Sequence, residues 1–547
     1  MRIGEFFKSL LPGSISISFA FLSSIVLAAS FPDFEIASLA WIALIPLFIS
    51  LEREKNSKRR AFITGWVFGT FFFFLTGWWL TFAPITYAGF PSLLAYFLLL
   101  CVALVAGLFP AAASLLTAHT LKRFGRNGIF AAPFYWIGFE FLRFWLTGNN
   151  WNTIGYSQAF TSIVEFATIG GVHVVGFTIV IFNAAFSFLI MDQFGNGTAG
   201  RPLLSRILKT SAAVFLPLAG IILVSSGFLN AEEKTSRKKF EPNADSAAIV
   251  VAVQPNVPMA GLDRSKWSRL RARQTSVAGR EVERIRSNPE LKDKPLTVIL
   301  PESPMNYQYE ADPEFRAFIN GFATKYDVSV LFNSAEPDSR RKYGFFNSAV
   351  LVSPEGEKIA QYDKIHLLPF GEFVPLPEFA QSLIPPMVGR FSFGEEYDRL
   401  PVGDAKSGVM ICFESHFPSL SREYVLNGAD VLIEMTNDGY LGPTPVLRQH
   451  LASAAFRAAE THRPVLRTTN VGVTAYIDEW GKIHDEADVY KEDVKVWGVS
   501  KSEGKITYSV RFGDWFAWLC SLVSIGLVGS GFLSVRNSKD ENPIKGS

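Results

Sequence analysis

Long apolar runs dominate the first 230 residues of the chain, and one more lies near its C-terminus. Most of them approach the ~20 residues that a helix needs to cross the hydrocarbon of a bilayer. The runs lie at 14–31, 36–51, 61–83, 91–118, 129–146, 164–191, 207–229 and 512–535. They predict a membrane domain at 1–230 with about seven transmembrane helices, and a separate C-terminal transmembrane helix at 512–535. Pro46 interrupts the second run, so we expect a tilted or partial span there.

The charged residues between these runs predict how the chain is oriented. Lysine and arginine gather in three alternate short loops and are almost missing from the loops between them. The basic loops are 53–60, 122–126 and 201–209, and the others include 31–35 and 147–162. Because positively charged loops stay on the cytoplasmic side, Met1 and the tail at 536–547 are expected in the cytoplasm. Seven crossings then place residue 230 outside.

Between residues 231 and 511 the composition changes to that of a water-soluble domain. Charged residues become frequent, and the apolar runs shorten to strand length. Strand candidates rich in Val and Ile lie at 248–254, 297–300, 328–333, 348–352, 408–411 and 431–434. Helices are predicted at 266–286 and at 446–461, the second bounded by prolines. This pattern predicts an α/β sandwich at 231–511 that begins with a linker at 231–244.

The composition argues against several classes of function. The formal net charge of +2 offers no concentrated basic face of the kind that nucleic-acid binding needs, so no nucleic-acid partner is expected. Two of the three cysteines, Cys101 and Cys520, lie in apolar runs, where cysteine acts as a small apolar residue. The sequence contains no CxxC pair, HExxH motif or glycine-rich phosphate loop. We therefore expect no metal, no disulfide and no cofactor.

Three predicted strand ends in the soluble domain each lead to a residue that nucleophilic catalysis can use. They are Glu302 in Leu-Pro-Glu, Lys364 in Tyr-Asp-Lys, and Cys412 in Met-Ile-Cys-Phe-Glu. A thiol of ordinary pKa is only slightly ionised at neutral pH, so a catalytic cysteine needs a base or a positive charge nearby. Glu302 can supply the base. Lys364 can stabilise the negative charge that develops on a carbonyl oxygen.

Each of these residues also has a simpler interpretation. A single cysteine at a strand end is most often a buried small apolar residue. Glu302 alone could cap a helix, and Lys364 alone could be a solvated surface charge or could pair with Asp363. The three residues together favour a catalytic set over the separate interpretations.

The motifs around these residues resemble those of the nitrilase superfamily: Pro-Glu after a strand, Asp-Lys followed by His366, and the Ile-Cys-Phe-Glu elbow. The segment 364–375, Lys-Ile-His-Leu-Leu-Pro-Phe-Gly-Glu-Phe-Val-Pro, resembles the signature of the bacterial apolipoprotein N-acyltransferases. Three later segments and one in the membrane half are similar to that family as well. They lie at 436–439, 449–458, 467–472 and 140–148. The resemblance spans the whole chain.

This resemblance implies a multi-pass α-helical membrane domain, a nitrilase-like αββα sandwich and a two-step reaction. Cys412 takes a fatty acyl chain from a phospholipid as a thioester, then yields it to the α-amino group of a diacylglyceryl-modified lipoprotein cysteine. Glu302 is the general base, Lys364 holds the oxyanion, and Glu372 and Glu414 support the site. A carboxylate close to Lys364 favours the charged amine, whereas one close to Glu302 raises the pKa of that base. The sequence leaves their placement open.

The implied substrates explain why such an enzyme has a membrane half. Donor and acceptor both carry acyl chains, so the resemblance implies a bacterial inner-membrane protein whose catalytic domain lies in the periplasm. Arg143 lies near the outer end of its apolar run, where we expect a snorkelled or headgroup-contacting side chain. It could equally pair with Glu140, which lies three residues away on the same helical face.

Four aromatic residues are further candidates for substrate contact. Trp151, Trp267, Phe413 and Tyr440 could line an acyl or headgroup pocket, although aromatic residues are also ordinary core and interface residues. The chain departs from the usual family pattern at two of them. Phe413 stands where tyrosine commonly follows the nucleophile, and Tyr440 with Leu441 replaces a typical Trp-Phe. These departures leave the proposed triad unchanged.

Two other functions fit part of the pattern. A membrane-tethered nitrilase-type amidohydrolase would use the same three residues but pass the acyl group to water. A transporter or receptor would use the outward domain only to bind a ligand, but its spans should then carry mid-membrane charges. These spans offer little beyond Glu140, Arg143 and His173. The long signature and the large membrane half favour the acyltransferase, and a monomer is the default because no sustained heptad appears.

Overall fold

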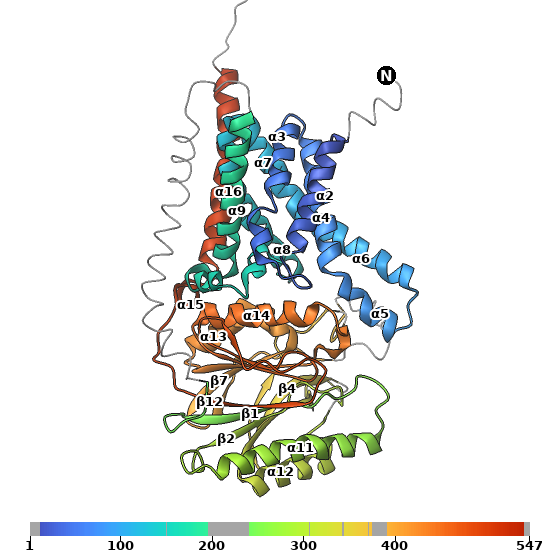
Figure 1. The fold of residues 1–547 in the computed structure, drawn as a ribbon, viewed down its shortest axis with the longest axis vertical. Helices are drawn as coiled ribbons and strands as arrows, with labels where there is room; N and C mark the ends of the chain where they lie inside the picture. The colour runs from blue at the N-terminus through green and yellow to red at the C-terminus, as the bar shows by residue number, and fades with distance from the viewer. Residues whose placement is uncertain are drawn as a thin grey trace, which may run out of the picture. The chain divides into compact units, whose positions relative to one another are not determined.

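The computed structural model describes residues 11–148, 150–194, 240–305, 307–341, 344–369, 371–374 and 391–540. The chain divides into two compact units (Figure 1). The first comprises Met1–Gly227 with Asp514–Ser547, and the second is Phe228–Gly513. The span predicted at 207–229 and most of the linker predicted at 231–244 lie outside the described residues.

The first unit is built from apolar helices. They are α2 (Ser14–Ala28), α3 (Ile45–Glu54), α4 (Lys58–Thr76), α5 (Phe82–Thr86), α6 (Ser92–Ala106), α7 (Leu108–Phe124), α8 (Ala132–Thr147), α9 (Ala167–Phe194) and α16 (Trp515–Asp540). Small residues allow α4 and α7 to approach closely, because a side chain at Gly65 or Gly69 would collide with the backbone of α7 or the residue before it. On α6, large side chains such as Leu93 and Phe97 are exposed, as they are on helices that face lipid.

In the part of the chain that the structure describes, fewer helices have the length of a full span than the sequence predicts. Among the described residues, the helical runs Ser92–Thr147 and Ser162–Gln193 are long and apolar enough to cross a membrane. The pair Lys58–Thr76 and Trp78–Thr86 is bent by 60° and adds a third only if it is counted as one span. The helix α2 and the segment Trp515–Gly529 are apolar but shorter. The count of about seven spans therefore stays a prediction.

Local breaks explain much of this difference. The apolar run at 36–51 divides into a short 3-10 turn and α3, which has Pro46 in its first turn. By contrast, α7 and α8 are separate helices that pack on each other, as the separate runs at 91–118 and 129–146 predict; Gly125, with a φ of 60° and a ψ of −153°, ends α7 and turns the chain. Gly170 and Gly171 have non-helical backbone angles and kink α9 near its start.

The last helix of the first unit, α16, packs on α8 and α9 (Figure 1). Trp515 Nε1 donates a hydrogen bond to the Ile169 carbonyl at 2.9 Å. The Trp518 ring packs edge-on against Phe141, with 5.0 Å between the ring centroids. A helix from the C-terminal end of the chain thus completes a bundle whose other described helices precede residue 195.

The second unit contains two six-stranded sheets. Its strands are β1 (Ala248–Gln254), β2 (Leu296–Ile299), β3 (Ser329–Pro337), β4 (Phe345–Val352), β5 (Lys358–Asp363), β6 (Arg399–Val402), β7 (Ala405–Ile411), β8 (Val431–Thr436), β9 (Val465–Thr469), β10 (Ala475–Ile477), β11 (Ile483–His484) and β12 (Asp493–Val499). One sheet has the order β12-β1-β2-β3-β4-β5, and the other has the order β11-β10-β9-β8-β7-β6. In each sheet, three adjacent strands run parallel to one another. They are β1, β2 and β3 in the first sheet and β7, β8 and β9 in the second.

Helices cover the outer faces of the two sheets, giving the predicted α/β sandwich (Figure 1). The helices α11 (Arg264–Arg286) and α12 (Pro313–Tyr326) contact the first sheet, and α13 (Pro418–Leu426) and α14 (Val446–Thr461) contact the second. The predicted helices at 266–286 and 446–461 are confirmed, as are the six predicted strands with small shifts of their ends. The carboxyl ends of β2, β7 and β8 lead to the candidate site.

Candidate active site

Cys412, the candidate nucleophile, lies at a sharp turn that follows a buried strand. The strand β7 ends at Ile411, and the 3-10 turn η7 (Cys412–His416) begins directly after it. Cys412 has a φ of 53°, a left-handed conformation that costs a residue with a Cβ roughly 1–2 kcal/mol. Such strain persists only where surrounding contacts impose it, and it is common at active sites.

Glu302, the candidate base, lies beside this thiol. It follows β2, and its carboxyl group shares a hydrogen bond with the Cys412 side chain. The second sheet reaches it as well, because the Asn437 N–H donates to its Oε2 at 3.1 Å. Burial raises the pKa of Glu302 above its ordinary value, although Lys364 opposes the shift. A carboxylate with a raised pKa is a better proton acceptor for a thiol.

Lys364 is only 1% exposed and forms a buried ion pair with Glu372. Its Nζ lies 2.9 Å from Oε1 and 2.8 Å from Oε2 of that carboxylate, which also accepts a hydrogen bond from the Leu368 N–H at 2.7 Å. Burial alone would lower the pKa of Lys364, but Glu372 and other nearby acidic groups outweigh it and raise the pKa. Glu372 also raises the pKa of Glu302, so both effects that the sequence left open apply to this carboxylate.

Asn347 joins Glu302 to Glu372, and sequence reasoning missed it. Its Nδ2 donates to Glu302 Oε1 at 3.0 Å and to Glu372 Oε1 at 2.6 Å, and its Oδ1 accepts from Asn333 Nδ2 at 2.7 Å. Both asparagines lie in strands that are otherwise mostly apolar, β4 and β3. That pattern was the available signal, because a buried amide must find hydrogen-bond partners and so points to a polar site.

Glu414 anchors the Cys412 turn to the segment that carries Lys364. It is fully buried and accepts hydrogen bonds from one hydroxyl and three backbone N–H groups. These come from Tyr362 Oη at 2.7 Å, Ile365 at 2.8 Å, His366 at 3.0 Å and Ile411 at 2.8 Å. Burial raises the pKa of Glu414 to about 7, although Lys364 and these donors oppose it. This carboxylate therefore supports the site through the backbone on both sides.

The surroundings of Cys412 favour the protonated form of its thiol. Burial raises the pKa of Cys412 well above its ordinary value, the nearby Glu302 raises it further, and Lys364 opposes them. A nucleophile at this position therefore needs a base in contact with its sulfur, and the Glu302 carboxyl group is in hydrogen-bond contact with it. Lys364 provides the fixed positive charge. No group of three His, Cys, Asp or Glu side chains suited to hold a metal ion lies among the described residues.

Three of the aromatic candidates belong to the second unit and have different surroundings. Phe413 is buried, and its ring packs edge-on against Phe417 with 5.3 Å between the centroids. Trp267 is partly buried against the apolar core on the α11 side of the first sheet. Tyr440 is 48% exposed. The first two match the interpretation as core residues, and substrate contact by all three stays a prediction.

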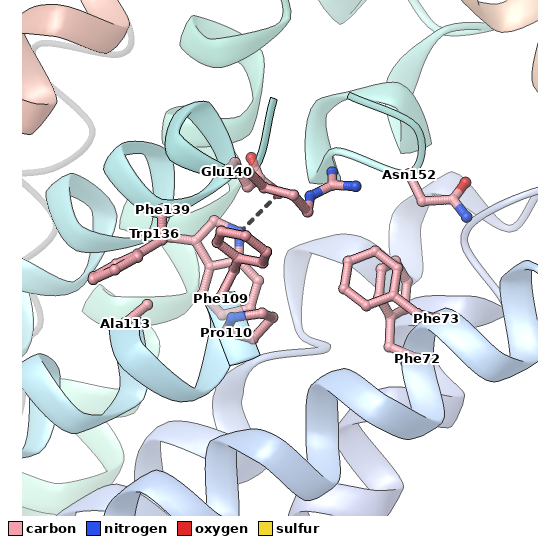
Figure 2. A pocket seen from close by; sticks show the side chains of 10 residues that line it. Phe72, Phe73, Phe109, Pro110, Ala113, Trp136, Phe139, Glu140 and Asn152 are labelled. Atoms are coloured by element: carbon pink, nitrogen blue, oxygen red, sulfur yellow. Dashed lines mark hydrogen bonds between the residues drawn. The ribbon is translucent and has the colours of Figure 1, made fainter. Parts of the chain in front are cut away.

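In the first unit, Glu140 and Arg143 line a pocket whose other walls are mostly aromatic (Figure 2). Its remaining lining residues are Phe72, Phe73, Phe109, Pro110, Ala113, Trp136, Phe139 and Asn152. Arg143 donates to the Trp151 carbonyl at 2.8 Å and to Thr153 Oγ1 at 3.2 Å. Glu140 accepts from the Ile154 N–H at 2.9 Å. Arg143 and Glu140 thus both form hydrogen bonds with the segment that follows α8. Headgroup contact by Arg143 or Trp151 stays a prediction.

Comparisons with known proteins give two matching family models. Residues 23–185 match the apolipoprotein N-acyltransferase N-terminal domain, and residues 284–502 match the carbon-nitrogen hydrolase domain. The apolipoprotein N-acyltransferase of Geobacter metallireducens is 30% identical over 508 residues, which cover 92% of each chain. That of Thermotoga maritima is 25% identical, covering 94% of this chain and 93% of its own. Among solved structures, a variant amidase of Nesterenkonia sp. AN1, with an acetamide moiety covalently added at its active-site cysteine, is 18% identical with a TM-score of 0.36, covering 47% of this chain and 92% of its own.

Proposed function

The chain belongs to the apolipoprotein N-acyltransferase family, and we propose that it acylates bacterial lipoproteins through a thioester on Cys412. It is an enzyme of lipoprotein maturation. The acyl donor in this proposal is a phospholipid, and the acceptor is the free α-amino group of a diacylglyceryl-modified N-terminal cysteine. Both substrates are lipids or lipid-bearing chains, which accounts for the apolar helical unit.

In the first step, the sulfur of Cys412 attacks the carbonyl carbon of a phospholipid ester while Glu302 takes the thiol proton. The carbonyl oxygen becomes an oxyanion, and the Lys364 ammonium stabilises its charge. When the tetrahedral intermediate collapses, the C–O bond of the ester breaks. Glu302 returns the proton to the leaving oxygen, so a lysophospholipid departs and the acyl chain remains on sulfur.

In the second step, the α-amino nitrogen of the lipoprotein attacks the thioester carbonyl. Glu302 accepts a proton from the attacking nitrogen, and Lys364 again stabilises the oxyanion. Collapse breaks the C–S bond, forms the amide, and returns the proton to the sulfur of Cys412. Glu372 and Glu414 act as supporting residues, the first by holding Lys364 and the second by holding the backbone around Cys412 and Lys364.

One observation carries the proposal: the Cys412 thiol, on a left-handed turn, is hydrogen-bonded to Glu302 close to a buried Lys364–Glu372 ion pair. An activated nucleophile, its base and an oxyanion stabiliser are the parts that acyl transfer needs. A binding protein would gain nothing from burying a cation beside a strained thiol.

The location and the finer details of the substrates are part of the same proposal. The enzyme lies in the bacterial inner membrane as a monomer, with a multi-span domain at 1–230, a periplasmic catalytic domain at 231–511, a helix at 512–535 and cytoplasmic termini. The basic loops support this orientation. The enzyme contacts its substrates, in this proposal, through Arg143, Trp151, Trp267, Phe413 and Tyr440.

Intact-mass analysis of the full chain, purified from its own membrane, tests the thioester. We expect a fatty-acyl adduct that neutral hydroxylamine removes and that is missing from Cys412→Ser. The control Cys520→Ser, which removes a buried cysteine of α16, should keep the adduct. No adduct on the wild type after addition of phospholipid would refute the thioester step. Release of free fatty acid in the presence of a diacylated lipopeptide would indicate a hydrolase instead.

A further inference from the structure

A second set of charged residues lies behind Cys412, and the reaction described above does not use it. It consists of Glu434 on β8, Asp438 just after that strand, His450 on α14 and Arg467 on β9. Glu434 and Arg467 are fully buried, and Asp438 and His450 are each 3% exposed. Charged groups are rarely buried to this degree unless they are paired. We refer to these four residues as the buried charge network.

Arg467 and His450 each bridge the two carboxylates of the network. Arg467 forms an ion pair with Glu434, its neighbour across β8 and β9, and its Nη2 donates to Asp438 Oδ2 at 2.8 Å. His450 places Nδ1 2.7 Å from Asp438 Oδ1 and Nε2 3.1 Å from Glu434 Oε1. Gly472 makes room for this arrangement, because a Cβ there would collide with the Asp438 carboxylate.

His450 also contacts the nucleophile's own backbone. Its Nε2 lies 3.0 Å from the carbonyl oxygen of Cys412. A carbonyl and an ionised carboxylate only accept hydrogen bonds, so both ring nitrogens of His450 must carry a proton. Burial alone would lower the pKa of His450, but Asp438 and Glu434 outweigh it and raise the pKa to about 9. The ring of His416 stacks on His450 at 5.4 Å.

We propose that His450 is a positioning residue for acyl transfer, and that its imidazolium holds the Cys412 carbonyl so that the strained turn presents the thiol to Glu302 and Lys364. This inference rests on the proposed function, in which Cys412 is the nucleophile. A residue with a Cβ keeps a left-handed conformation only when its surroundings impose it. The hydrogen bond from His450 is such a restraint, and it acts at the strained residue.

The network also reaches the base through a single peptide unit. Asn437 and Asp438 are consecutive: the Asn437 N–H donates to Glu302 Oε2 at 3.1 Å, and Asp438 binds the His450 ring. The end of β8 therefore ties the base and the nucleophile to the same four charges. A change in the network alters the geometry between Glu302 and Cys412, on which proton transfer depends.

The test uses the full-length enzyme in detergent micelles that contain phosphatidylethanolamine, and compares His450→Ala, His450→Gln and the wild type. We measure the rate of Cys412 alkylation by iodoacetamide and the rate of thioester formation across pH 6 to 9, together with thermal unfolding. The matched control is His484→Gln. His484 forms a pair of the same 2.7 Å length with Asp478, on an edge strand of the same sheet.

We expect His450→Ala to slow both rates by about 100-fold, the size of loss that misplacement of a reacting group produces. His450→Gln, whose amide can still donate to the Cys412 carbonyl, should recover a large part of that loss, and His484→Gln should match the wild type. Wild-type rates in both His450 variants would overturn the proposal, whatever their melting temperatures. Failure of the proposed function would look different, because Cys412→Ser would then still transfer acyl groups.

Discussion

Replacing Asn347 with leucine tests the hydrogen-bonded link between the proposed base, Glu302, and the Lys364–Glu372 ion pair. The substitution keeps the size of the side chain but removes the amide that donates to Glu302 at 3.0 Å and to Glu372 at 2.6 Å. Glu302 keeps the Asn437 N–H as a donor, and Glu372 keeps Lys364. The two carboxylates thus stay in place with one donor fewer each.

The expected loss of stability follows from these contacts. A hydrogen bond to a charged group contributes about 1.5–3 kcal/mol. The substitution also removes the acceptor of Asn333 Nδ2, which keeps the Ser348 carbonyl. Because each carboxylate retains another donor, we expect Asn347→Leu to lower the free energy of unfolding by about 3 kcal/mol rather than by the full sum of three bonds. At about 2–4 °C per kcal/mol for a unit of this size, the melting temperature falls by about 6–12 °C.

The variant should also shift the pH dependence of acylation. Asn347 donates to the charged form of Glu302 and so helps to lower the pKa of that carboxyl group. Its removal raises the pKa of Glu302, and since the base must be ionised to accept the thiol proton, the acidic limb of the rate moves to higher pH. The assay is the rate of thioester formation against pH.

The control for this experiment is Asn333→Ala. It removes the donor to the Asn347 carbonyl oxygen at 2.7 Å but leaves both carboxylates bonded to Asn347. Because Asn333 Nδ2 also donates to the Ser348 carbonyl at 3.1 Å, the substitution removes two bonds between neutral groups and should cost about 2 kcal/mol, while it leaves the acidic limb in place. An Asn347→Leu variant that melts and titrates like the wild type would refute the link.

Three further predictions follow from the same region. Glu372→Gln leaves Lys364 buried without its ionic partner, so we expect a loss of about 3–5 kcal/mol in stability and little thioester by intact mass. Normal acylation would show that Lys364 does not need Glu372. Cys412→Gly relieves the left-handed backbone, so it should be more stable to heat than Cys412→Ala by about 1 kcal/mol, and equal melting would argue against strain. The stability that charged His450 contributes is complete below pH 6.5 and is lost as the pH rises through about 9. The melting temperature of the wild type should therefore fall more over this window than that of His450→Gln, and parallel curves would speak against the charged ring.

The sequence predicted those parts of the fold in which residue type and burial agree. Strands such as β1 and β8 are rich in Val or other apolar residues and were found from that pattern alone. The strand β9 was missed because Arg467 interrupts its apolar run, and that arginine is buried because both Glu434 and Asp438 pair with it. One helix break was also hidden, since Gly170 and Gly171 kink α9 inside the run at 164–191, whose composition predicts continuous helix.

Three residues of the candidate site could be predicted because local sequence pattern marks their positions. Glu302, Lys364 and Cys412 each follow a strand end, and a strand end can be recognised from local pattern. Asn347 and His450 could not be found in this way, because their partners lie 45 and 38 residues away in the chain. Contacts of that kind depend on how strands pair and helices pack, which no single window of sequence contains.

The packing of α16 on α8 and α9 has a consequence for biosynthesis. The helix α16 can join the bundle only after the whole of Phe228–Gly513 has been translated. At ~5–20 residues per second, that interval lasts about 15–60 s. During it, the surface that Trp515 and Trp518 later cover on α8 and α9 must be shielded by lipid or by a helper protein of the insertion machinery. A chain whose synthesis stops within Phe228–Gly513 therefore has a bundle without α16.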